Sequence, residues 1–219
     1  MLALLFENPV LFVVVLLAII VALTVHEFSH ALVGYKLGDS TAMRLGRLTL
    51  NPMAHIDWYG LLLLVLVGFG WGKPVPFNPH NLKWQKWGPV WVALAGPLSN
   101  LVLAILFAVV ANVLVMWTDI GSANALLVFL TFGVVINLAL CLFNLIPIPP
   151  LDGSKLLFLL LDKPQYTELR FRLETQGTWL LIGIILFDAI LNVGLFSKFF
   201  GVVQWLAVNV FLSGFTTIL

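Results

Sequence analysis

The sequence contains few charged residues and almost no cysteine. Only 10% of its 219 residues are Asp, Glu, Lys or Arg, whereas 61% are hydrophobic. Soluble domains carry about a quarter charged residues, so this composition excludes a soluble globular protein and indicates an integral membrane protein. A net charge of +1 gives no basis for nucleic acid as a partner. The single cysteine, Cys141, excludes an intramolecular disulfide.

Long apolar stretches predict the membrane spans. A hydrocarbon core about 30 Å thick requires about 20 apolar residues of helix. The stretches that meet or approach this length are 8–36, 89–117, 124–148, 178–196 and 199–218. A further apolar stretch, residues 58–71, is short and rich in glycine. We therefore expect an all-α polytopic membrane protein with five to six transmembrane helices.

The connections between these stretches are too short for an added soluble domain. They comprise residues 37–57, 72–88 and 149–177. The sequence thus predicts a single membrane-embedded domain over residues 1–219. Its core covers about 8–160, and a helical hairpin covers about 178–219.

Two segments between the first and third apolar stretches have patterns that are not helical. Leu48–Leu50 alternates apolar and polar residues before the turn signal Asn51-Pro52, which favours a short strand or hairpin. Residues 73–79 contain three prolines, each of which disfavours helix in the residue before it. We expect short membrane-associated β or re-entrant segments here.

A histidine pair with an adjacent glutamate ends the first apolar stretch, in the sequence TVHEFSHAL. On a helix, His26 and His30 lie on one face, close enough to bind one ion. Glu27 lies beside the pair, where a glutamate can take a proton from metal-bound water. Ionisable side chains at membrane depth are expensive and usually functional, so a simply solvated histidine pair is the less favoured interpretation.

A catalytic zinc site needs a third protein ligand and an open position. Asp152 follows the apolar stretch 124–148 and is a candidate, although an aspartate at this place is also a favoured helix N-cap. His55 and His80 are interpreted as polar loop residues, and Asp188 receives no role. Asn100 is interpreted as an interhelical hydrogen-bonding residue, aided by the small residues near it.

Several motifs occur together in one order. HEFSH (26–30) is followed by GRLTLNPMAHID (46–57), GWGKPVPFNP (70–79), GPLSN (96–100) and NLIPIPPLDG (144–153). With these motifs the chain closely resembles the site-2 protease family of intramembrane zinc metalloproteases, over about residues 20–160. It is similar to the compact prokaryotic members that lack PDZ or CBS domains.

The resemblance implies a function and a role for each matching position. His26, His30 and Asp152 would be the metal ligands for one zinc ion per chain, and Glu27 the general base. Asn144 matches an asparagine thought to help hold the substrate or the oxyanion. The expected substrates are single-span membrane proteins, cut within or near their transmembrane helices.

Three alternatives use the same residues differently. A divalent-metal transporter or channel would use the histidines and Asp152 as a transit site, but it would need polar residues spaced through several spans. A catalytically silent adaptor that binds membrane helices would have no need of Glu27. A di-iron enzyme of the histidine-box type needs many more than four histidines.

The proposed ligands also constrain the topology. His26 and His30 lie near the end of the first span, and Asp152 follows the end of 124–148, so one ion can bind all three only if these ends meet at one membrane face. We therefore predict that 58–71 enters and returns, or lies shallow. Ten of the eleven Lys and Arg residues then fall on one side, with Lys198 left over. The positive-inside rule places the site in the cell membrane nearer the cytoplasmic face.

Overall fold

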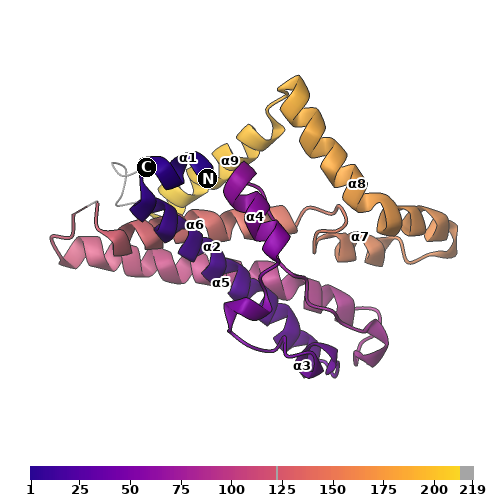
Figure 1. Ribbon diagram of the computed structural model, residues 1–219. Helices are drawn as coiled ribbons and strands as arrows, with labels where there is room; N and C mark the ends of the chain where they lie inside the picture. Colours follow the sequence, from indigo (N-terminus) through magenta and orange to yellow (C-terminus); the bar gives the residue numbers. More distant parts are fainter. Residues whose placement is uncertain (122, 213–219) are drawn as a thin grey trace.

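A computed structural model describes residues 1–121 and 123–212 and is predominantly helical (Figure 1). The α-helices are α1 (Leu2–Glu7), α2 (Pro9–Lys36), α3 (Thr41–Arg44), α4 (Trp58–Val67), α5 (Gly88–Trp117), α6 (Ala125–Asn144), α7 (Ser154–Leu160), α8 (Thr167–Leu191) and α9 (Leu195–Leu206). The shorter turns are η1 (Pro52–Ala54), η2 (Pro79–Asn81), η3 (Pro164–Tyr166) and the π-type η4 (Ala207–Phe211).

The prediction of an all-α polytopic membrane protein is confirmed in its helical content and in its several apolar helices of membrane-spanning length. Within the described ranges, four helical segments are long and apolar enough to cross a membrane: Pro9–Lys36, Gly88–Trp117, Ala125–Asn144 and Pro164–Leu191. This is fewer than the five to six expected, because α4 and Leu195–Phe211 are shorter apolar helices. Residues 213–218 of the last expected span lie outside the described residues.

Helix α2 begins where its sequence provides a cap. The side chain of Asn8 accepts a hydrogen bond from the Leu11 amide at 3.0 Å, and Pro9 occupies the first helical position. Both residues suit a helix start, since Asn satisfies a free amide and proline needs no partner there. The helix continues without a break to Lys36, so the HEFSH motif lies within its last three turns.

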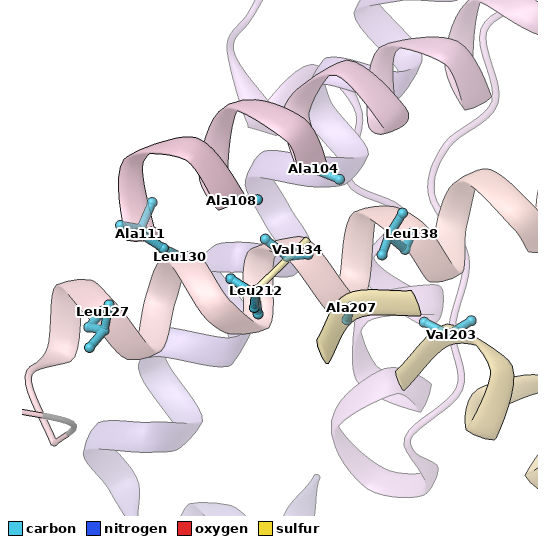
Figure 2. Close-up of a cluster of buried hydrophobic side chains, with 10 residues drawn as sticks. All are labelled: Ala104, Ala108, Ala111, Leu127, Leu130, Val134, Leu138, Val203, Ala207 and Leu212. Atoms are coloured by element: carbon cyan, nitrogen blue, oxygen red, sulfur yellow. The ribbon is translucent and has the colours of Figure 1, made fainter. Parts of the chain in front are cut away.

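The core is formed by α5 and α6 with α2 and the C-terminal helix packed against them. Three alanines on one face of α5, Ala104, Ala108 and Ala111, are buried against larger side chains of α6 such as Leu130 and Val134 (Figure 2). Small residues let membrane helices approach closely, so packing rather than hydrophobic exclusion stabilises this contact. Val203, Ala207 and Leu212 complete the same cluster from the C-terminal segment.

The segment around α4 folds back so that its two ends lie side by side. Ile56 and Gly72 form an isolated antiparallel bridge, and the Lys73 amide donates to the His55 carbonyl at 2.9 Å. Gly68, with φ of +86°, ends α4 in the left-handed conformation that glycine adopts freely.

The strand expected at Leu48–Leu50 is not formed; these residues form bends, and the described residues contain no strand. The reason is that the Asn51 side chain accepts from the Met53 amide and caps the turn η1, which draws the chain away from an extended path.

Two connections of the chain are hydrogen-bonded directly to each other. Buried Asp39, just after α2, accepts hydrogen bonds from the Asn78 amide at 2.6 Å and the Asn81 side chain at 3.0 Å. The Lys83 amide also donates to the Leu37 carbonyl at 2.8 Å. The connection after α2 and the connection before α5 therefore lie together.

Helices α8 and α9 meet at the turn Asn192–Gly194. Both residues have positive φ values, and Asp188 accepts hydrogen bonds from the Leu195 and Phe196 amides at 2.7 and 3.1 Å. Asp188 thus caps α9, a role that the sequence did not reveal. Helix α8 stands away from the bundle (Figure 1), although Gly177 lies against Pro149, since a Cβ on Gly177 would be 2.5 Å from the Pro149 Cβ.

Candidate metal centre

The histidine pair lies buried on one face of α2. His26 and His30 are separated by one helical turn, and their Nε2 atoms lie 3.0 Å apart. Their rings are arranged edge to face, with centroids 4.6 Å apart. The spacing of four residues therefore produces the shared face that the sequence predicted.

Asp152 reaches this pair from the loop between α6 and α7. Its Oδ2 atom lies 3.2 Å from Nε2 of His26 and 3.3 Å from Nε2 of His30. The alternative role as N-cap of the following helix is not adopted, because Gly153 is the N-cap and no side chain caps α7. One ligand atom from each of the three residues lies within 4.8 Å of the others.

The Asp152 loop folds closely onto the end of α6. The Gly153 amide donates to the Asn144 carbonyl at 2.7 Å, and a Cβ on Gly153 would lie 2.2 Å from the Leu145 carbonyl oxygen. Only glycine fits at this approach. The LDG sequence thus supplies both the carboxylate and the residue that lets the loop turn towards α2.

Hydrogen bonds to the outer ring nitrogens fix the histidine tautomers. Nδ1 of His26 lies 2.6 Å from Oδ1 of Asn100, and Nδ1 of His30 lies 2.7 Å from the Val92 carbonyl oxygen. Both partners are acceptors, so each Nδ1 must carry the proton. Each Nε2 atom then presents a lone pair towards the other and towards Asp152.

Three acceptor atoms facing one another at this distance repel unless a cation lies among them. The Oδ2 atom of Asp152 is buried and has no hydrogen-bond partner within the described chain, which identifies it as an atom that needs such a cation. Two neutral imidazoles and a carboxylate are a usual donor set for catalytic zinc. The residues present therefore fit a zinc ion.

Gly96 of α5 leaves the space that the imidazoles occupy. A Cβ at this position would lie 2.4 Å from Nε2 of His30 and 2.6 Å from Nε2 of His26. The sequence interpretation connected the small residues of GPLSN with helix packing in general. The sequence does not show that Gly96 lies against the Nε2 atoms of His26 and His30, because these residues are far apart in the chain.

Glu27 is also buried and receives a backbone hydrogen bond from a distant segment. The Val75 amide donates to its Oε2 atom at 3.1 Å. Pro74 and Pro76 have no N–H, so Val75 carries the single backbone donor within residues 74–76. Buried Arg47 holds the run in place by donating to the Lys73 carbonyl and to the Pro74 carbonyl, the latter at 3.2 Å. The sequence indicates Glu27 as a candidate but gives no sign of these partners.

The remaining candidates are not members of the His-His-Asp cluster. Asn100 is completely buried and hydrogen-bonds across helices, as predicted. Asn144 ends α6 and donates to the Leu140 carbonyl; among the described residues no hydrogen bond joins its side chain to the three clustered residues. His55 is buried with Nε2 at 2.8 Å from the Thr49 carbonyl oxygen, whereas His80 is exposed. Neither belongs to the cluster.

A His-His-Asp set that could hold a metal ion, with a glutamate beside the two histidines on a helix of membrane-spanning length, is the arrangement of a membrane metallohydrolase. The chain belongs to peptidase family M50, whose model matches residues 14–123 and 110–190. It is therefore a zinc metallopeptidase of the site-2 protease type, and its membrane helices make it an intramembrane protease.

Relatives with curated names support this assignment. The chain is 42% identical over 144 residues to the candidate zinc metalloprotease YwhC of Bacillus subtilis, covering 64% of this chain and 66% of that protein. It is 31% identical over 206 residues to the candidate zinc metalloprotease Rip2 of Mycolicibacterium smegmatis, covering 89% and 73%. A third such relative, MJ0611 of Methanocaldococcus jannaschii, is 30% identical over 158 residues, covering 67% and 70%. No solved structure matches the chain significantly.

Proposed function

We propose that His26, His30 and Asp152 bind one zinc ion per chain and that Glu27 is the general base in cleavage of membrane-anchored proteins. The observation that carries this proposal is the convergence of the three ligand atoms within 4.8 Å, with Asp152 Oδ2 buried and unsatisfied within the described chain. When bound, zinc acts as a Lewis acid towards the scissile carbonyl and acidifies water.

Each protein group has a separate task in this reaction. Glu27 takes the proton from the attacking water and delivers it to the leaving nitrogen. The Val75 amide, at 3.1 Å, orients the Glu27 carboxylate. Asn144, at the end of α6 beside the Asp152 loop, helps to hold the substrate carbonyl or the oxyanion.

The substrates are single-span membrane proteins cut within or near the transmembrane helix. A helix has no free backbone donors or acceptors in its interior, so the substrate must unwind locally before it is cut. The extended run 73–77 is supported by Arg47 and lies beside Glu27 through the Val75 contact. An unwound substrate segment pairing near this run would come close to the base.

The centre lies in the membrane nearer the cytoplasmic face, with α4 in a segment that enters and returns. This topology is supported by the Ile56–Gly72 bridge and by the hydrogen bonds of Asp39 with residues 78 and 81, which join the segments on either side of α4. It also places ten of the eleven Lys and Arg residues on one side.

The metal transporter and the silent adaptor fit these observations less well. A metal transporter would need coordinating side chains along a path through the membrane, whereas the metal-ligating group in the described residues is a single cluster. A silent adaptor would not require Glu27, which is buried beside the ligands and oriented by a backbone amide.

The test separates metal binding from chemistry. Glu27→Gln should bind one zinc per chain with unchanged affinity and lose cleavage of a reconstituted single-span substrate, because the ligands remain while the base is lost. Asp152→Ala should weaken zinc affinity itself. Cleavage by purified Glu27→Gln at the wild-type rate would show that this mechanism is wrong.

A further inference from the structure

A chain of buried side-chain amides leads from the metal centre into the middle of the helix bundle. It begins at His26 on α2, passes to Asn100 on α5 and ends at Asn137 on α6. Both asparagines have no exposed surface. Buried amides in an apolar bundle are costly unless every group is paired, so their pairing determines their orientation.

The orientation of Asn137 is set by a backbone carbonyl of its own helix. Its Nδ2 atom donates to the Gly133 carbonyl at 2.8 Å. A carbonyl can only accept, so the amide nitrogen must face Gly133, and Oδ1 must face the other way. That oxygen lies 2.7 Å from Nδ2 of Asn100.

Asn100 transmits this orientation to the histidine. Its Nδ2 donates both to Asn137 and to the Ala22 carbonyl at 3.1 Å, which uses both of its protons. Its Oδ1 atom therefore faces Nδ1 of His26 at 2.6 Å and can only accept. Nδ1 of His26 must carry the proton, so the Nε2 lone pair faces the metal-binding side.

We infer that Asn137 is a positioning residue for the metal centre, acting through Asn100 to fix the ring orientation and tautomer of His26. The inference rests on the proposed zinc ligands. Partners of this kind, which hold the second nitrogen of a ligating histidine, typically change metal affinity about 10–100-fold when they are removed. In the part of the chain that the structure describes, no hydrogen bond joins the Asn137 side chain to a proposed ligand, so its effect must pass through Asn100.

The experiment compares zinc affinities of purified full-length variants in competition with a chelator. Asn137→Leu should weaken zinc binding about tenfold. Asn100→Leu should weaken it at least as much. Combining both substitutions should add little to Asn100→Leu alone, because the second asparagine acts through the first. A merely structural role would give additive losses instead.

Thr131 provides a matched control on the same helix. It is buried like Asn137, but its hydroxyl donates to the Leu127 carbonyl of its own helix at 2.8 Å. In the described residues no hydrogen bond connects this hydroxyl to Asn100 or His26. Thr131→Val should leave zinc affinity unchanged. Equal losses in Thr131→Val and Asn137→Leu would overturn the inference, as would wild-type affinity in Asn137→Leu. Where the leucine variant does not fold, Asn137→Ala replaces it, with the same expectations.

A second measurement reads the tautomer directly. In metal-free wild-type protein, nitrogen NMR of labelled histidine should show His26 protonated at Nδ1, and Asn137→Leu should populate the other tautomer. An unchanged tautomer in that variant would overturn the inference. If the wild type binds zinc and His26→Ala does not, the proposed ligands stand whatever the tautomer measurement shows. A wild type that binds no zinc would overturn both the proposed function and the role of Asn137.

Discussion

A methyl group on Gly96 would lie 2.4 Å from Nε2 of His30, closer than any carbon and nitrogen can approach without displacement. This contact connects the first third of α5 to the Nε2 atoms of the two histidines on α2. It makes the smallest residue of the GPLSN motif a requirement of the metal centre.

Gly96→Ala should therefore displace one imidazole and weaken zinc binding about tenfold to a hundredfold, since overpacking costs about 1–3 kcal/mol. Zinc affinity in competition with a chelator measures the effect. Gly183→Ala is the control, because a Cβ at that position in α8 meets nothing within 4 Å. Zinc affinity that is the same in both variants would contradict this interpretation.

The composition of the substrate helix should control the rate of cleavage. Gly and Pro cost a helix about 1 and 3 kcal/mol relative to Ala, so they make local unwinding easier. Replacing a single Gly near the cut by Leu should slow cleavage about fivefold, because nearly 1 kcal/mol is added to the unwinding step. Cleavage rates of reconstituted substrates test this, and insensitivity to such replacements would indicate recognition outside the membrane.

The topology predicts that two connections face the cytoplasm together. Single cysteines at partly exposed Ser40 and exposed His80, in a Cys141→Ala background, should react with an impermeant thiol reagent only from the cytoplasmic side. His80 is chosen instead of Asn81 because the Asn81 side chain donates to Asp39. Labelling of the two positions from opposite sides would contradict a re-entrant α4 segment.

Asp39 should make the stability of these connections depend on pH. Burial would raise the pKa of its carboxyl, but hydrogen bonds from Thr41, Asn81 and Asn78 outweigh it and hold the pKa below the ordinary value of 3.8. Because the folded pKa is the lower one, this stabilisation is present above the unfolded pKa and is lost as pH falls through the folded value.

Thermal unfolding of the wild type should therefore lose stability below about pH 4. Asp39→Asn should be less stable at pH 7, because an amide cannot accept all of these bonds, and its stability should change less between pH 6 and pH 3 than that of the wild type. An equal pH response in both proteins would show that Asp39 does not contribute to it.

The parts of the centre that follow local rules could be predicted from the sequence. His26 and His30 share a face because four residues make about one helical turn, and Asp152 belongs to a motif that occurs in order with HEFSH. Residues whose roles depend on distant contacts could not be assigned. Gly96, Arg47 and Val75 meet the centre only through tertiary packing, and nothing in their own neighbourhood indicates which atoms they face.

The fold was predictable to a similar extent. Apolar runs predicted α2, α5 and α6, but the strand at Leu48–Leu50 was wrong because alternation over three residues is too short to oppose the capped turn at Asn51. Asn137 lies within an apolar stretch as an isolated amide, a signal of a buried contact. Its partner across the bundle could not be known before the helices were packed.

The proposed ligands come from two distant parts of the chain, so a bound metal would also join those parts. His26 and His30 are neighbours on one helix, whereas Asp152 arrives from a loop far along the chain, and with one cysteine the protein has no disulfide to join these regions. A metal held by all three residues would join the end of α2 to the loop before α7 in the folded protein. Because the unfolded chain lacks the assembled site, the free energy of metal binding would add to the stability of the fold. The reaction centre would then also stabilise the membrane domain. Chelation should weaken the contact between the end of α2 and the Asp152 loop at the same time as it stops the chemistry.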